Sequence, residues 1–208
     1  MHEKIINDFG EHKYDILLGT QMIAKGLDFP MVTLVGVINA DSSLNVPDFR
    51  SAEVTFGLLS QVSGRAGRSD LAGEVIIQSY NPQHYSINYA KHHDYYNFYK
   101  EEMSIRKTLN YPPYYYITLV NITSRDYDLG FKEANKIGEF LRKNLSSDTK
   151  ILGPSMANVF RINNVYHYQC IIKYKRDDKL NSVLTHIDNI YKINNKVDIS
   201  IDVDPIRV

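Results

Sequence analysis

The sequence contains a single cysteine, Cys170, and no tryptophan among its 208 residues. One thiol excludes an internal disulfide and a cysteine-rich zinc site, because each of these needs more than one thiol. A lone cysteine also suits the reducing environment of the cytoplasm, where disulfides are rare. We therefore expect a cytoplasmic chain with no metal site of its own.

Charge of one sign is not in excess either. Lysine and arginine together number 24, aspartate and glutamate together number 24, and the formal net charge is zero. Any contact with nucleic acid must then come from a local patch and not from the bulk charge of the chain. Long apolar runs are lacking too, since the longest, residues 31–38, is far below the ~20 residues that a membrane-spanning helix needs. Residues 1–11 are polar and of mixed charge, unlike a secretory signal, so we expect no membrane partner.

The most consequential absence is that of a phosphate-binding loop and a magnesium-binding acidic pair. No G-x-x-x-x-G-K-[ST] loop occurs in the sequence, and no Asp-Glu pair follows an expected strand. In nucleotide-driven motors these motifs supply most of the ligands to the ATP phosphates and to Mg²⁺. By itself, the chain is therefore not expected to hydrolyse ATP.

Two arginines stand three residues apart in the string QVSGRAGR at residues 61–68, and Arg65 and Arg68 each follow a glycine. Glycine lets the backbone approach a ligand closely, and the guanidinium group is a permanently charged fork that matches phosphate oxygens. In nucleotide-dependent motors, such arginines stabilise the charge that develops on the γ-phosphate. The alternative is a surface turn whose arginines pair with carboxylates, and the motif alone leaves both open.

A second string favours the phosphate-binding interpretation of the two arginines. Residues 15–30, DILLGTQMIAKGLDFP, resemble motif V of superfamily 2 helicases, and residues 61–68 resemble their motif VI. Together with DFRSAE at 48–53, YPP at 111–113, LGP at 152–154 and DVDP at 202–205, they resemble the primosomal protein N′ family. That family is the bacterial DNA helicase that restarts stalled replication forks. The resemblance covers essentially the whole chain, and the ordered combination is far more specific than either helicase motif alone.

The resemblance assigns roles to the arginine string. It implies that Arg65 and Arg68 supply positive charge at the γ-phosphate, and that Gln61 hydrogen-bonds near the nucleotide or couples it to motion. It also implies that ATP and Mg²⁺ are cofactors of an intact protein, held mostly by a lobe that this chain lacks. We expect the chain to be the C-terminal portion of that longer protein.

The upstream string receives roles from the same resemblance. Gly26 and Asp28 are expected against the nucleotide, where the carboxylate suits a ribose hydroxyl, and Lys25 could serve nucleotide or DNA. Thr20 and Gln21 are expected to face the translocating strand and to contact phosphates without reading sequence. Without the resemblance, a loop carboxylate that caps backbone amides would be the preferred interpretation of Asp28.

The resemblance also implies partners: branched or forked DNA, single-stranded DNA, single-strand binding protein and other primosome proteins. One family feature has no counterpart here, because the cysteine-rich zinc module of primosomal protein N′ cannot be built from one cysteine. Any zinc of the intact protein is therefore expected outside this chain.

Residues 1–80 are expected to form an α/β unit, part of a RecA-like helicase lobe with a parallel sheet. Apolar runs predict buried strands at 15–18, 31–38 and 74–79, and a helix over 48–64 that Asp48 could cap. Residues 39–47 are polar and are expected to be irregular. Residues 81–112 predict two connecting helices, whose interleaved aromatic and basic residues would either pack against the lobe or form a stacking platform for single-stranded nucleic acid.

Residues 113–208 predict a ferredoxin-like domain of order β-α-β-β-α-β. The expected strands are 114–122, 157–162, 166–174 and 197–203. The helices between them are expected to begin at Asp126 or Asp128 and at Asp177 or Asp178. In the third strand, alternation places Tyr168 inward and the intervening residues on the other face.

The clearest basic cluster lies where that third strand runs into the second helix. Its members are Lys173, Lys175, Arg176 and Lys179. The cluster could meet the phosphates of forked DNA or the acidic tail of single-strand binding protein, and a merely solvated surface is the alternative. Asp177 and Asp178 interrupt the cluster, which disfavours the contact with an acidic tail in particular.

Overall fold

The computed structural model describes residues 2–20, 29–64, 73–192 and 197–206. The chain divides into two compact units, one formed by residues 1–46 and 50–102 and the other by residues 47–49 and 103–208. Helix α6 (Tyr95–Leu109) contributes to both. Helix α5 (Tyr85–Lys91) belongs to the first unit.

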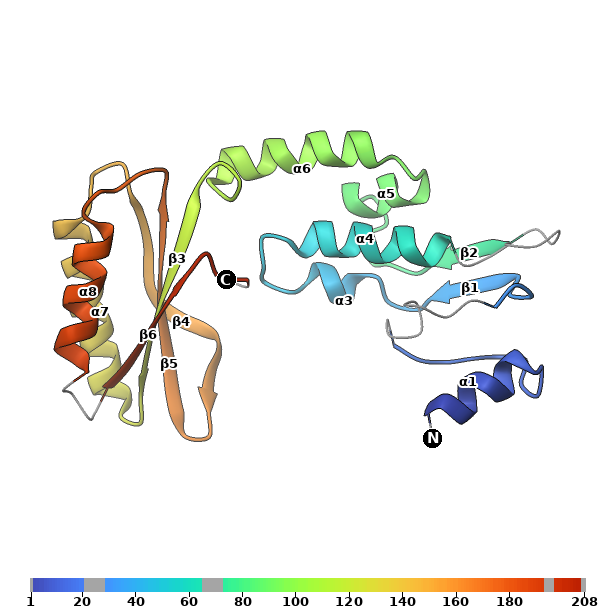
Figure 1. Ribbon diagram of the computed structural model, residues 1–208, viewed down its shortest axis with the longest axis horizontal. Helices are drawn as coiled ribbons and strands as arrows, with labels where there is room; N and C mark the ends of the chain where they lie inside the picture. The colour runs from blue at the N-terminus through green and yellow to red at the C-terminus, as the bar shows by residue number, and fades with distance from the viewer. Residues whose placement is uncertain (1, 21–28, 65–72, 193–196, 207–208) are drawn as a thin grey trace. The chain divides into compact units, whose positions relative to one another are not determined.

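The first unit is built on a small parallel sheet. Strands β1 (Leu34–Val37) and β2 (Glu74–Ile77) pair in register from Leu34 opposite Glu74 to Val37 opposite Ile77 (Figure 1). The described residues of this unit also form the helices α1 (His2–Gly10), α3 (Asp41–Leu44) and α4 (Ser51–Ser63). A mixed α/β unit with a parallel sheet is therefore confirmed.

One strand prediction in this unit is wrong, and a second predicted strand is too long. Residues 15–18 form no strand, and Ile16 and Leu18 are 84% and 78% exposed. The predicted strand 31–38 shrinks to the four residues of β1, whose burial alternates between exposed and half-buried. An apolar run predicts a strand buried on both faces only where further strands and helices cover it, and the described part of this unit has two strands.

The helix boundaries also differ from the prediction. Helix α4 begins at Ser51, with Arg50 and not Asp48 at the N-cap position, and Arg50 makes no side-chain cap bond. The segment 39–47, expected to be irregular, contains the short helix α3, whose entry is shaped by Asn39. Asn39 Oδ1 accepts hydrogen bonds from the amides of Asp41 and Ser42, a local side-chain bond that polar segments favour.

An aromatic core joins α4 to α5 and α6. Phe56 stacks on Phe98 with ring centroids 4.1 Å apart and planes 10° apart, and Tyr85 lies 5.9 Å from Phe98. Leu59 and Ala90 complete the buried cluster. For Phe98 and Tyr85, packing against the lobe is therefore the correct alternative to a stacking platform.

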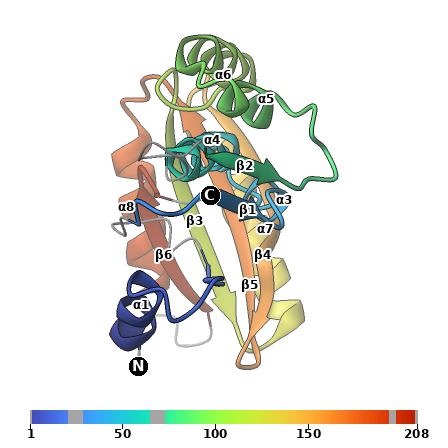
Figure 2. The same cartoon turned by 90° about the vertical axis from the view of Figure 1, so that its right-hand side faces the viewer.

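The second unit is a four-stranded antiparallel sheet with two helices. Its elements run β3 (Tyr116–Ser124), α7 (Tyr127–Asn144), β4 (Lys150–Ile162), β5 (Val165–Tyr174), α8 (Leu180–Tyr191) and β6 (Val197–Val203). The strand order across the sheet is β4-β5-β3-β6. Figures 1 and 2 show α7 and α8 on one face of this sheet. The core between them contains Val120, Ile122, Ile137, Leu141, Tyr168, Cys170, Ile172, Leu184 and Ile187.

Aspartates set the starts of both helices, in different ways. Asp126 is the N-cap of α7, and its Oδ1 accepts a hydrogen bond of 2.9 Å from the Leu129 amide. Asp177 lies before α8, whose N-cap is Lys179. The Asp177 carboxylate accepts hydrogen bonds from the Lys179 amide and from Thr149 Oγ1, so Asp177 also fixes the loop that follows α7.

Gly153 in the LGP string has a backbone that other residues rarely adopt. Its φ is +93°, and a Cβ atom there would lie 2.6 Å from the carbonyl oxygen of Gln169 on the neighbouring strand. The pairing of β4 with β5 shifts register between Leu152 and Ser155 at this point. Arg142 on α7 donates to the Gly153 carbonyl and ties the irregular strand to the helix.

Candidate functional site

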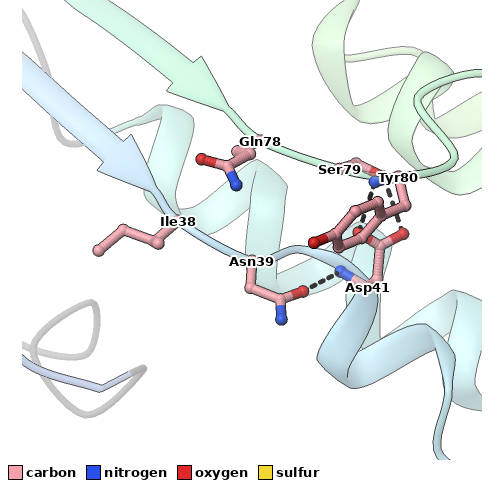
Figure 3. A pocket seen from close by; sticks show the side chains of 6 residues that line it. All are labelled: Ile38, Asn39, Asp41, Gln78, Ser79 and Tyr80. Carbon is pink, nitrogen blue, oxygen red and sulfur yellow. Dashed lines mark hydrogen bonds between the residues drawn. The ribbon is translucent and has the colours of Figure 1, made fainter.

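Polar side chains gather where β1 and β2 end. Because the two strands are parallel, their carboxyl ends lie at the same edge, which is where α/β sheets keep their ligands. A cavity of about 210 Å³ opens there (Figure 3). It is lined by Ile38, Asn39, Asp41, Gln78, Ser79 and Tyr80.

Asp41 organises this edge. One carboxylate oxygen accepts from Ser79 Oγ and the other from the Tyr80 amide, both at 2.8 Å (Figure 3). The hydrogen bond from the Tyr80 amide is the largest cause that lowers the pKa of Asp41; burial opposes it, and the Ser79 hydroxyl adds to it. The carboxylate is thus engaged within the protein, and the side chains of Asn39 and Gln78 supply the other polar groups of the cavity.

Sequence reasoning missed these residues, although the signal was present. Two predicted parallel strands, 31–38 and 74–79, imply that the residues after each strand meet at one edge of the sheet. Asn39 and Asp41 follow the first of these strands. Gln78 and Ser79 belong to the predicted second strand and follow β2, which ends at Ile77.

The helicase motif V string is described only at its two ends. Gln21, Lys25, Gly26 and Asp28 lie outside the described residues, and their roles stay predictions. Thr20 is exposed at the near end. At the far end, Phe29 packs edge-on against Phe9 of α1, with centroids 4.8 Å apart.

The motif VI string continues directly from α4. Arg65 and Arg68 lie outside the described residues, so their roles also stay predictions. Gln61 is exposed in the last turn of α4, whereas Leu59 and Val62 beside it are buried. The helix therefore buries its apolar face in the unit and presents Gln61 to solvent just before the arginines.

The basic cluster of the second unit keeps three exposed members, Lys175, Arg176 and Lys179. Arg176 Nε lies 3.1 Å from Asp178 Oδ1 in an ion pair whose side chains are 86% and 79% exposed. Lys175 Nζ lies 5.3 Å from the centroid of the Tyr115 ring. Exposed pairs of this kind contribute little to stability, so the cations remain available to a phosphate or carboxylate ligand.

Lys173 does not belong to this surface, and its assignment to the cluster is wrong. It is only 4% exposed, and its Nζ donates to the Leu109 carbonyl oxygen at 3.1 Å. Nζ also lies 3.3 Å from the centroid of the Tyr111 ring. Burial, and secondarily the charge of Lys150, lower the pKa of Lys173 to about 8. Strand alternation placed Lys173 on the uncovered face correctly, but it could not show that residues 109–111 cover that face.

The described ranges offer neither a cluster of metal ligands nor a membrane-spanning helix. Within them, no three histidine, cysteine, aspartate or glutamate side chains gather as metal ligands would. Nor does any helix placed by the structure have the length and apolar character needed to cross a bilayer.

Two family descriptions match the chain. Residues 107–206 match "Primosomal protein N C-terminal domain", and residues 1–70 match "Helicase conserved C-terminal domain". Between the two matches lie residues 71–106, which contain β2, α5 and most of α6.

Curated relatives match over almost the entire chain. Replication restart protein PriA of Bacillus subtilis is 56% identical over 98% of this chain and 26% of its own length. The proteins of the same name from Chlamydia muridarum and Synechocystis are each 40% identical, over 99% and 100% of this chain. The chain thus spans about a quarter of the length of these relatives.

Proposed function

Because the chain belongs to the primosomal protein N family, we propose that it works within an ATP-dependent 3′-to-5′ DNA helicase that restarts stalled replication forks. The observation that carries this proposal is the identity of 56% to a replication restart protein over nearly all of the chain. The match of residues 1–70 to a helicase domain supports the motor activity.

The chain contributes one wall of a split nucleotide site in this proposal. Arg65 and Arg68 reach the γ-phosphate, where an arginine finger can supply about 10³ to 10⁵ in rate. Gln61 hydrogen-bonds near the nucleotide, and its exposed place in the last turn of α4 supports that role. The phosphate-binding loop and the Mg²⁺ ligands are not in this sequence and belong to another part of the protein.

The motif V string serves both ligands. Gly26, Lys25 and Asp28 approach the nucleotide, and Asp28 accepts a hydrogen bond from a ribose hydroxyl. Thr20 and Gln21 donate to the phosphates of the translocating strand, and the exposure of Thr20 supports this.

We assign the second unit to the ferredoxin-like class. Support comes from its element order, strand-helix-strand-strand-helix-strand, and from its antiparallel strand order β4-β5-β3-β6. In the helicase, this unit holds branched or forked DNA through Lys175, Arg176 and Lys179. Single-strand binding protein and other primosome proteins are further partners of the intact protein in this proposal.

A second candidate function is that of a non-enzymatic binding module. The exposed cations of the second unit favour it, because they need no nucleotide to act. Fluorescence anisotropy of the chain with labelled forked DNA tests it. Binding should weaken linearly in log–log coordinates as salt rises, with a slope set by the phosphates engaged. Absence of salt-sensitive binding would remove the support for the module.

The isolated chain is expected to show no ATPase activity. It lacks the ligands that hold the triphosphate and Mg²⁺, and losing that whole set costs far more than losing one arginine. A coupled ATPase assay with forked DNA checks this. Turnover above the enzyme-free blank would show that a complete nucleotide site lies within the chain and would contradict the split-site proposal.

A further inference from the structure

Strand β6 forms one edge of the sheet of the second unit (Figure 2). Among the described residues it pairs with β3 alone, in an unbroken antiparallel register along residues 197–203. The outer side of an edge strand presents a row of backbone N–H and C=O groups that no ladder bond occupies. Such an edge is a template for pairing with one more strand.

The register determines which residues of β6 turn their backbone groups outward. The Asp204 amide donates to the carbonyl oxygen of Ile117, the residue opposite it, at 2.9 Å. Because an antiparallel ladder alternates between hydrogen-bonded and non-hydrogen-bonded pairs, every second residue counted back from Asp204 also bonds toward β3. The backbone groups of Ile199, Ile201 and Val203 therefore turn away from the sheet.

These three residues also line a groove beside the edge. A cavity of about 470 Å³ lies between α8 and β6. Its lining residues are Ile199, Ser200, Ile201 and Val203 from β6, with Asn181, Leu184, Thr185 and Asp188 from one stripe of α8. Val203 is 55% exposed there, whereas Leu184 is buried. An added strand would direct every second side chain into this groove, where apolar groups are in contact with apolar walls.

The other face of β6 is acidic. Asp198 and Asp202 project to that face, because side chains alternate along a strand, and both are exposed. Strand β6 itself contains no lysine or arginine. Within the part of the chain that the structure describes, neither of the two carboxylates has an ion pair or a hydrogen bond. Asp188 in the groove differs, because it already pairs with Lys192 Nζ at 2.5 Å.

We propose that the β6 edge binds an extended, basic peptide segment of a partner protein, which adds to the sheet as a further strand. Main-chain hydrogen bonds to Ile199, Ile201 and Val203 hold the segment, and its alternate side chains give selectivity. Its apolar side chains enter the groove beside α8, and its lysine or arginine side chains lie next to Asp198 and Asp202. This surface repels DNA, so its partner is distinct from the DNA of the proposed function.

The competing interpretation is that the two aspartates only protect the edge. Charged side chains on an edge strand commonly prevent it from pairing with another chain. A basic peptide would then be attracted by charge and would form no backbone bonds. A second copy of this chain is a less suitable occupant, because two β6 edges would bring like charges together.

Amide exchange of the isotope-labelled whole chain, resolved by residue with NMR, tests for the backbone bonds. The probe is a synthetic peptide of eight residues that alternates lysine and valine and has blocked ends. At saturating peptide, the amides of Ile199, Ile201 and Val203 should exchange roughly tenfold more slowly. Those of Ser200 and Asp202, already bonded to β3, should change little. Binding that leaves the three outward amides unprotected would overturn the proposal, as would the absence of saturable binding up to ~1 mM peptide.

Two N-methylated forms of the peptide test the same bonds without altering the chain. One form carries N-methyl groups on its valines and the other on its lysines. In a strand that pairs along one side, the N–H groups of only one of these two sets face β6. One form should therefore lose binding in fluorescence anisotropy and the other should keep it. Equal binding of the two forms would overturn strand addition.

Variants of the chain test the contribution of each face. Val203→Pro removes one outward N–H and no bond to β3, and Val203→Ala keeps that N–H. Val203→Pro should bind the peptide roughly three- to tenfold more weakly than Val203→Ala. The double change Asp198→Asn with Asp202→Asn should weaken binding roughly 2- to 30-fold. Asp148→Asn, at an exposed aspartate in the loop before β4, should leave binding unaltered.

Sedimentation of the chain without peptide addresses the second copy. The proposal predicts no concentration-dependent dimer that Val203→Pro abolishes. A dimer of that kind would show that β6 pairs with itself and would overturn the choice of a basic partner segment. Equal peptide affinity of the double aspartate variant and the unaltered chain would overturn it as well.

Discussion

Lys173 combines a charged group with almost complete burial, and its lowered pKa is the measurable result. On folding, its ammonium group loses contact with water and contacts the Leu109 carbonyl oxygen and the face of the Tyr111 ring. Burial therefore disfavours the charged form and lowers the pKa to about 8, against an ordinary value of 10.5. The group is protonated near neutral pH, and burial of its charge lowers the stability of the folded state.

The pH dependence that follows can be measured. Between pH 8 and 10.5 the unfolded chain binds more protons at this site than the folded chain, so this group makes the free energy of unfolding rise with pH. From pH 7 to pH 10, the free energy of unfolding of the unaltered chain, measured in urea, should rise by on the order of 1–2 kcal/mol relative to that of Lys173→Met. A difference between the two proteins that is flat with pH would show that the lysine is not desolvated.

The backbone geometry at Gly153 predicts that adding one methyl group there lowers the free energy of unfolding strongly. Gly153→Ala forces a side chain into a backbone with φ of +93° and brings its Cβ against the Gln169 carbonyl oxygen. We expect a loss of roughly 2–4 kcal/mol in the free energy of unfolding of the second unit. Gly57→Ala in α4 is the matched control, because a Cβ there meets open space. It should be neutral or stabilise by about 1 kcal/mol, as alanine favours helix. Equal effects of the two changes would contradict the geometry at Gly153.

At the scale of elements, helices and strands with a repeated apolar pattern were predicted well, whereas strands inferred from a single short apolar run were not. Helices α7 and α8 and strands β5 and β6 each bury one face through several periods, so local sequence decided them. Strand β1 is short because the burial of an apolar run depends on elements that cover it. Strand β4 begins at Lys150, seven residues before its predicted start at 157, since a register shift at Gly153 lets pairing begin before the apolar alternation does.

The candidate site divides in the same way. The arginine string and the motif V string were recognised through their resemblance to helicase motifs, and the roles of their residues stay predictions. The cavity at the ends of β1 and β2 depends on which residues a parallel pairing brings together, as Asp41 and Ser79 show. The burial of Lys173 depends on a segment more than sixty positions away, whose carbonyl group it contacts.

The start of α7 gives a prediction that separates two sequence candidates. Asp126 accepts a hydrogen bond from the Leu129 amide, whereas Asp128 lies in the first turn. Asp126→Ala should cost about 1 kcal/mol in thermal or urea unfolding, because an amide of the first turn loses its partner. Asp128→Ala should cost less, about 0.3–1 kcal/mol, through the helix dipole alone. A larger loss from Asp128→Ala would show that the cap is assigned to the wrong residue.

At the scale of the whole molecule, the chain joins a helicase portion to a domain of the primosomal protein N family. Helix α6 contributes residues to both compact units, and residues 47–49 group with the second unit. In the proposal for the whole, Arg65 and Arg68 serve the nucleotide, and Thr20 and Gln21 serve the translocating strand. Lys175, Arg176 and Lys179 serve branched or forked DNA.

The most direct test of the proposal is the steady-state ATPase of a full-length protein that contains this chain, with Arg65→Ala and Arg68→Ala measured separately. Each substitution should lower kcat by about 10³ to 10⁵, with little change in thermal stability, because the proposal has the positive charge act on the γ-phosphate in the transition state. Arg125→Ala, a change at an exposed arginine of the second unit, is the control and should leave kcat unaltered. Arg65 and Arg68 variants that hydrolyse ATP at the unaltered rate would contradict the claim that this chain forms one wall of the nucleotide site.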